Sequence, residues 1–233
     1  MTTPEQLPLP LPVRTARGRE DYFVSDSNAL AVSQIDHWQT WQPRKFVLTG
    51  PPASGKTHLA NVWATASGAR IIDADTLIEA DIPSLAHHNL CVEAPDAQCG
   101  DDEFERALFH LHNLILANGH ALLLTARMPV RDWPIALPDL KSRMMGTLSA
   151  RLEDPDDTLL SALLLKLFAD RQITPAPDVI PYLATHMPRS YAAAHEIVTR
   201  LDTAAMARAS GVTRPLAKSV LTKLADTDDP AHL

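Results

Sequence analysis

The sequence has few cysteines, no long apolar run and no excess of basic residues. Cys91 and Cys99 are its only cysteines, which is too few for a disulfide framework, and nothing beside them resembles a metal site. The longest apolar candidate, residues 158–169, is interrupted by Lys166 and is shorter than the roughly 20 residues that cross a bilayer. The N-terminus lacks the basic and the continuous apolar segments of a secretion signal. We therefore expect a cytoplasmic protein with reduced thiols and no membrane contact.

Acidic side chains outnumber basic ones. The 233 residues include 28 Asp and Glu against 21 Lys and Arg, which gives a formal net charge of −7. A protein that binds DNA by itself usually presents a basic face. Contact with DNA is therefore expected to be weak or indirect, although a small basic cluster near the N-terminus (Arg14, Arg17 and Arg19) leaves a local contact open.

The first 20 residues are predicted to form a flexible arm. Residues 5–13, "EQLPLPLPV", alternate leucine with proline, which removes backbone donors and favours an extended, polyproline-like form. Leucines on a segment that cannot fold into a core need the surface of another molecule to bury them.

Residues 21–154 alternate between short apolar runs and helical stretches. This alternation predicts an α/β domain with a five-stranded parallel sheet. The expected strands are residues 45–50, 69–75, 89–97, 120–127 and 146–154, and the expected helices are 56–67, a weak segment 76–85, and 101–119. From Pro155 to the end the pattern is helical only, over 154–172, 176–187, 188–210 and 213–225. Residues 155–233 are therefore expected to form a small all-helical lid domain.

The strongest motif is "GPPASGKT", which fits G-x-x-x-x-G-K-[ST] at Gly50, Gly55, Lys56 and Thr57. An apolar strand precedes it and a helix follows, as a P-loop requires. Such a loop points backbone N–H groups at phosphates beside a helix N-terminus. Lys56 would reach the β and γ phosphates, and the Thr57 hydroxyl would be a ligand of Mg²⁺. The expected cofactors are ADP or ATP with Mg²⁺.

A P-loop ATPase also needs an acid at the end of a neighbouring strand. Glu93, at the end of "LCVE", is the candidate that would hold Mg²⁺ through water. A second acid often follows and polarises the attacking water, but this position is Ala94, and Asp96 lies out of register behind Pro95. Hydrolysis by this chain alone is therefore expected to be slow.

Two arginines lie where a side chain could reach a γ-phosphate. Arg143 precedes the last strand and could act on a neighbouring subunit, and Arg189 begins a lid helix and could act within the chain. Among the histidines, His110 and His112 are spaced to fall on different sides of one helix.

These residues together resemble the AAA+ core of the bacterial replication initiator DnaA. The resemblance runs from about residue 20 to about 225, through "FV…SN…A", "GPPASGKTHL", "LLLTA", "LKSR" and "PRSYAAAHEIVTRLD". It implies that Phe23 and Val24 pack the adenine base, that Arg143 is an arginine finger and that Arg189 is the sensor II arginine. The nucleotide-binding loop would then comprise Gly50, Pro51, Pro52, Ala53, Ser54, Gly55, Lys56, Thr57 and His58.

The sequence departs from DnaA at two positions on the γ-phosphate side. Ala94 replaces the second acid, and "TARMP" stands where DnaA has "TSDRP", so that Arg127 replaces an aspartate. Both changes remove a carboxylate and leave the groups that hold a diphosphate. The sequence therefore favours a protein that holds nucleotide over an efficient ATPase.

The resemblance also implies partners. An isolated DnaA-like core behind a short arm is typical of a regulator that binds the sliding clamp of DNA polymerase III and promotes hydrolysis of ATP held by DnaA. "QLPLPL" matches clamp-binding peptides, with Gln6 as the polar anchor and Leu7, Leu9 and Leu11 as apolar ones. DnaA would dock on the face that carries Arg143, self-association is possible, and the protein would work at the replisome. An ATP-driven loader or remodeller remains an alternative, whereas a small-molecule kinase is disfavoured because the helices come last.

Overall fold

The structure is a computed structural model that describes residue 19 and residues 22–208 and 211–227. The clamp-binding prediction for Gln6, Leu7, Leu9 and Leu11 lies outside the described residues. No helix in the described ranges is long and apolar enough to cross a bilayer.

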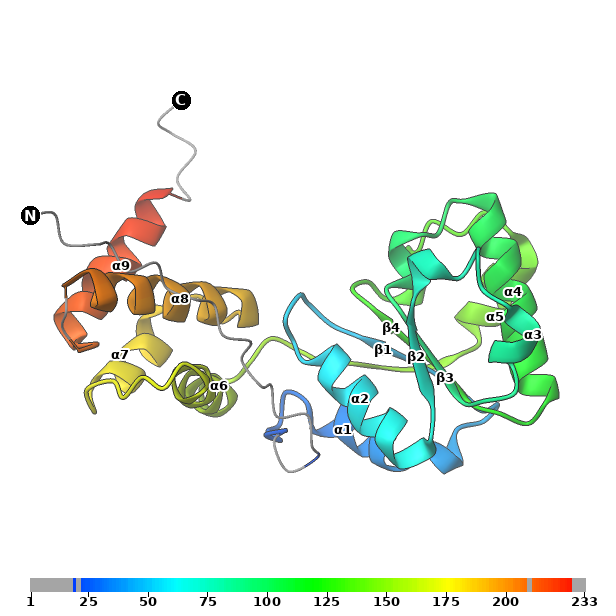
Figure 1. Cartoon of the computed structure of the whole chain (residues 1–233), viewed down its shortest axis with the longest axis horizontal. Coiled ribbons are helices and arrows are strands. Elements are labelled where there is room, and N and C mark those ends of the chain that lie inside the picture. The colour runs from blue at the N-terminus through cyan, green and yellow to red at the C-terminus, as the bar shows by residue number, and fades with distance from the viewer. Residues whose placement is uncertain (1–18, 20–21, 209–210, 228–233) are drawn as a thin grey trace, which may run out of the picture.

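A five-stranded parallel sheet forms the centre of the first domain (Figure 1). The strand order is β2-β3-β4-β1-β5, with β1 and β4 in the middle and buried along their whole length. The strands are β1 (Lys45–Thr49), β2 (Arg70–Asp73), β3 (Leu90–Glu93), β4 (Leu122–Ala126) and β5 (Leu148–Arg151). The predicted fold class is confirmed, although β3 ends at Glu93 because Ala94 turns the chain in a left-handed conformation.

Helices cover both faces of this sheet, because successive strand residues point to opposite sides. Val47 packs on one face with α4 and α5, and its neighbours Phe46 and Leu48 pack on the other with α1 and α2. The helices are α1 (Ala29–Asp36), α2 (Lys56–Ser67), α3 (Ile82–Leu85), α4 (Asp102–Ala117) and α5 (Pro138–Met145), with 3-10 turns η2 (Trp38–Thr40), η3 (Ala74–Thr76), η4 (Pro95–Ala97) and η5 (Val130–Asp132).

Two parts of this domain differ from the expectation. The weak helix predicted over 76–85 is helical only at its end, because the Asp81 side chain accepts the Ser84 N–H and starts a new turn at Ile82. The sequence pattern also gave no indication of helix α1, which closes one face of the sheet through Ala31, Val32 and Ile35.

The remaining helices form a second hydrophobic core, separate from the sheet (Figure 1). They are α6 (Asp157–Asp170), α7 (Val179–His186), α8 (Tyr191–Arg208) and α9 (Arg214–Thr227). Asp156 begins α6 by accepting the Leu159 N–H at 2.7 Å, and its other oxygen accepts the Ser27 N–H at 3.4 Å. This carboxylate therefore ties the first lid helix to the segment that precedes α1.

Candidate nucleotide-binding site

The glycine-rich loop connects β1 to the N-terminus of α2, as the motif predicted. Gly55 has a φ of 91°, in the left-handed region that favours glycine, and a Cβ there would lie 3.0 Å from the Tyr22 ring. The Gly55 backbone therefore allows both the turn and the close approach of Tyr22. A helix that starts at a glycine-rich loop presents backbone N–H groups that can bind an anion.

The Lys56 side chain folds back over this loop. Its Nζ donates to the carbonyl oxygens of Gly50 at 2.8 Å and Pro51 at 2.7 Å. Burial, reinforced by the positive charge of Arg127, lowers the pKa of Lys56 below its usual value. The loop thus holds an ammonium group at its mouth, with a second cation close by.

Oxygen atoms from three elements meet beside Lys56. The Thr57 hydroxyl donates to Glu93 Oε1 at 2.8 Å, and the Thr125 hydroxyl on β4 donates to the same oxygen at 3.3 Å. Mg²⁺ prefers such oxygen ligands and usually completes its shell with water and nucleotide phosphates. Within the described ranges no three His, Cys, Asp or Glu side chains form a metal site of their own. This donor set therefore fits a Mg²⁺ ion that arrives with a nucleotide.

Asp96 has a role that its place in the sequence did not reveal. It is buried on η4, and its Oδ2 accepts the backbone N–H groups of Arg127 at 2.9 Å and Met128 at 3.2 Å. The carboxylate therefore fixes the turn that follows β4 and sets the direction of Arg127. No local sequence signal predicts this bond, because it joins loops 31 and 32 residues apart.

Three adjoining cavities run along this edge. The first, about 200 Å³, lies between the two domains and is mostly apolar, and its lining includes Tyr22, Phe23, His58, Leu163, Tyr191 and His195. The second, about 200 Å³, lies over residues 53–57. The third, about 220 Å³, lies beyond Lys56 between Glu93 and Arg127. Shared lining residues join them into one trough, with an apolar end suited to a base and a charged end suited to phosphates.

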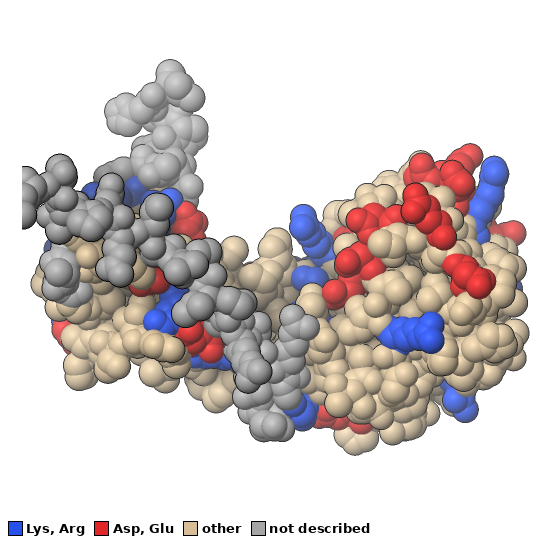
Figure 2. Space-filling view, in the orientation of Figure 1, with Lys and Arg blue, Asp and Glu red and all other residues tan. Residues whose placement is uncertain are grey.

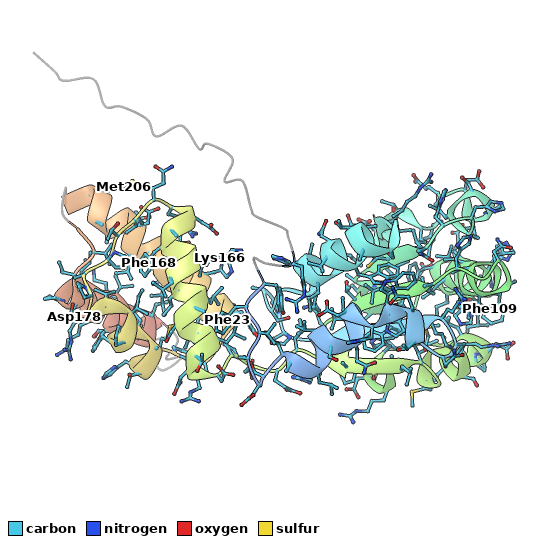
Figure 3. The ribbon with its side chains drawn as sticks, turned by 90° about the horizontal axis from the view of Figure 1, so that it is seen from below. Phe23, Phe109, Lys166, Phe168, Asp178 and Met206 are labelled. Atoms are coloured by element: carbon cyan, nitrogen blue, oxygen red, sulfur yellow. The ribbon has the colours of Figure 1, made fainter. Side chains whose placement is uncertain are left out.

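Of the two residues expected to pack the base, Phe23 lies at the apolar end of the trough and Val24 does not. Phe23 lines the first cavity, and Figure 3 shows it beside α6, near Lys166, whereas Phe168 points into the helical core. Val24 is exposed and does not line that cavity. His58 lines it and contacts the Tyr22 ring edge-on, with centroids 5.2 Å apart. Sequence reasoning missed Tyr22, Tyr191 and His195, which tertiary contacts bring here from two segments, the chain before α1 and helix α8.

Arg189 lies away from the loop. It precedes α8, and its guanidinium pairs with Asp157 at 2.9 Å, with both side chains mostly exposed. It lines none of the three cavities. The structure therefore does not bring Arg189 to the loop, and its sensor II role stays a prediction.

Arg143 lies at the edge of the sheet where the strands begin, opposite the edge that carries the P-loop. It is exposed in the last turn of α5, and its carbonyl oxygen accepts from Lys45 Nζ at 2.6 Å. Lys45 begins β1 and the P-loop follows the end of β1, so about 13 Å of strand separates the two edges. The structure does not bring Arg143 to the chain's own loop.

Comparison with known proteins places the fold. No family model matches the chain. An uncharacterized protein of Haemophilus influenzae is 27% identical over 228 residues, covering 93% of this chain and 98% of that protein. Domain III of the Thermotoga maritima replication initiation protein DnaA superimposes with a TM-score of 0.75 at 16% identity, covering 91% of this chain and 98% of that domain.

Longer initiator chains match over part of their length. DnaA from Aquifex aeolicus bound to AMPPCP gives a TM-score of 0.66 at 14% identity, over 78% of this chain and 64% of that one. A DNA replication initiation factor gives 0.67 at 15% identity, over 79% of this chain and 63% of that one. This chain thus spans less than two thirds of those proteins. At such identities the likeness shows the fold alone, which is that of domain III of DnaA.

Proposed function

We propose that this chain is a DnaA-related regulator of replication initiation, of the Hda type. It holds ADP or ATP with Mg²⁺ and stimulates hydrolysis of the ATP bound by DnaA. The observation that carries the proposal is the composition of the trough. The groups that bind phosphates are present, and the position beside Glu93 that would activate water holds Ala94.

Within the chain's own site, each residue has a part in binding. The loop N–H groups and Lys56 bind the phosphates, and Thr57 and Glu93 would hold Mg²⁺, the latter through water. A bound Mg²⁺ would neutralise phosphate charge and orient the β and γ oxygens. Asp96 is buried, accepts two backbone N–H groups through Oδ2, and does not line the cavity beyond Lys56, so it is not placed to polarise water there. Arg127 adds positive charge at the terminal-phosphate end, which favours retention of nucleotide over turnover.

Arg143 supplies the catalytic group that acts on DnaA. An exposed guanidinium at the far edge of the sheet can enter the nucleotide site of another molecule without disturbing its own. Met145 and Leu148, 55% and 46% exposed, are close in sequence and offer apolar area for a protein interface. An arginine supplied in trans stabilises the charge that develops on the transferring phosphate and is worth roughly 10³–10⁵ in rate.

The N-terminal arm is the proposed tether to the sliding clamp, through Gln6, Leu7, Leu9 and Leu11. Where the described chain begins, Arg19 forms a two-pronged ion pair with Asp36 on α1, at 3.0 and 2.9 Å. A variant with both Gln6→Ala and Leu9→Ala is expected to lose clamp binding and keep its nucleotide affinity. Equal clamp affinity for variant and wild type would reject the tether.

Contact with DNA is proposed to be indirect, through the clamp. Figure 2 shows Asp and Glu side chains gathered on part of the α/β domain, and exposed acids of this domain include Asp73, Asp75, Asp101, Asp102 and Glu103. Such a surface repels the phosphate backbone of DNA. We place the protein in the cytoplasm, at the replisome.

The deciding experiment measures hydrolysis of ATP preloaded on DnaA. The reaction contains this chain and clamp loaded on DNA, and parallel reactions omit one component each. We expect fast hydrolysis only in the complete mixture and little turnover by this chain alone. Rapid ATP consumption by this chain, stimulated by DNA and independent of DnaA, would favour the loader alternative and contradict the proposal.

A further inference from the structure

A lysine is buried beneath the helix that carries Arg143. Lys45 opens the central strand β1 and is 5% exposed. Its Nζ donates to the Arg143 carbonyl oxygen at 2.6 Å and lies 3.3 Å from Nε2 of His112 on α4. The Thr147 hydroxyl donates to the same carbonyl at 3.0 Å. The last turn of α5 is thus held from two sides at the residue proposed to act in trans.

The neighbours of His112 define how it meets Lys45. Nδ1 of His112 lies 3.1 Å from Asn113 Oδ1, an acceptor, so Nδ1 carries the proton and Nε2 accepts from the ammonium. Burial, reinforced by the positive charges of Lys45 and Arg143, lowers the pKa of His112 to about 4. A neutral imidazole therefore orients the ammonium group at neutral pH.

Burial of this cation is costly, and an ion pair does not compensate for it. Among the described residues no carboxylate forms an ion pair with Lys45. An apolar residue at the start of a fully buried strand avoids this desolvation cost. What a lysine adds is a charged donor to the C-terminal end of a helix, where the dipole favours a cation. Burial lowers the pKa of Lys45 to about 8, which still leaves it protonated at pH 7.

We propose that Lys45, oriented by His112, is a positioning residue that fixes the end of α5 and thereby the direction of Arg143. This inference rests on the proposed action of Arg143 on DnaA. The Lys45 ammonium also repels the Arg143 guanidinium, which favours an outward orientation of that side chain. Displacement of a reacting group by about 1 Å can cost on the order of 10² in rate, so a small shift of this helix end would matter.

The test uses Lys45→Met, which removes the charge and the donor and keeps an unbranched side chain. Hydrolysis of DnaA-bound ATP is measured against the concentration of this chain, to separate the maximal rate from the half-saturating concentration. We expect the maximal rate to fall by about 10- to 100-fold while the half-saturating concentration stays within about twofold. The matched control is Lys141→Met, an exposed lysine on the same helix, which should change neither value.

A second pair of variants keeps the proposal testable if Lys45→Met does not fold. His112→Gln retains an acceptor for the ammonium, and His112→Phe removes it. We expect His112→Gln to keep the maximal rate within about twofold and His112→Phe to lose at least about fivefold. Full maximal rates for both would overturn the proposal.

Arg143→Ala, measured in parallel, separates the two levels of failure. If Arg143→Ala abolishes stimulation while Lys45→Met and His112→Phe leave the maximal rate intact, the positioning role is wrong and the proposed function stands. If Arg143→Ala has no effect, the proposed action of Arg143 on DnaA is wrong, and the positioning role falls with it.

Discussion

The two edges of the parallel sheet are built in different ways. At the carboxyl edge, where the strands end, one contiguous segment from Gly50 to Thr57 supplies most of the candidate phosphate site, and Glu93 and Arg127 lie beside it. At the amino edge, Arg143 depends on Lys45 and His112, which lie 98 and 31 residues away in sequence. The first edge is suited to hold a nucleotide and the second to act on a partner. In the proposed function, one end of the sheet retains this chain's nucleotide, and the other end stimulates hydrolysis of the ATP held by DnaA.

The largest expected effect comes from a substitution at the amino edge. Arg143→Ala should lower stimulated hydrolysis of DnaA-bound ATP by about 10³-fold or more. The reason is that the transition state in the DnaA site loses the guanidinium that this chain supplies. Nucleotide binding by this chain should be unchanged, since Arg143 lies away from its trough. Arg106→Ala, an exposed arginine on α4, is the matched control in the same single-turnover assay. Undiminished stimulation by Arg143→Ala would move the finger to another residue.

Lys56→Ala tests the role of the carboxyl edge in binding nucleotide. Removal of the ammonium at the loop mouth should weaken ADP and ATP binding by at least about 100-fold, because charge-assisted bonds to phosphate are lost. The rise in melting temperature that saturating nucleotide gives the wild type should disappear, since a ligand stabilises only a fold that binds it. Titration calorimetry and thermal melts with and without nucleotide check both results. Retained affinity would show that the loop backbone suffices.

Much of the carboxyl edge could be predicted from sequence because its determinants are local. The spacing of Gly50, Gly55, Lys56 and Thr57 predicted the loop between β1 and α2, and the five strands follow from short apolar runs. Helical spacing also separated His110, which is exposed, from His112, which is buried. The sequence did not predict what His112 contacts, because Lys45 reaches it only in the folded chain. Asp96 and the two tyrosines of the trough were missed for the same reason.

A smaller effect concerns the relative affinity of this chain for ATP and ADP. Arg127 faces the cavity beyond Lys56, so its positive charge should matter mainly for a third phosphate. Arg127→Ala should weaken ATP binding by about tenfold and ADP binding by less than about threefold, the loss of one charge-assisted contact. Competition binding with the two nucleotides measures the ratio. An equal loss for both would place Arg127 nearer the diphosphate.

The smallest effect concerns the pH dependence of stability at the amino edge. The folded pKa of His112, about 4, lies below its ordinary value near 6.5, so the unfolded chain takes up this proton first as pH falls. The stabilisation is present above pH 6.5 and is lost as pH falls toward 4, by about 1–2 kcal/mol at pH 5. Urea unfolding at pH 7 and pH 5 should show that His112→Gln loses less stability than wild type. Identical losses would indicate that His112 does not titrate in this way.

In the proposed function, this chain keeps its nucleotide while the ATP bound to DnaA loses its γ-phosphate. A double-label experiment tests this directly. DnaA and this chain are loaded separately with ATP that carries different labels on the γ-phosphate, then mixed with clamp on DNA. Free nucleotide is removed before mixing, and both labels are followed through one turnover. We predict rapid release of the label from DnaA and retention of the label on this chain. Release of this chain's label first, with the DnaA label retained, would contradict the account.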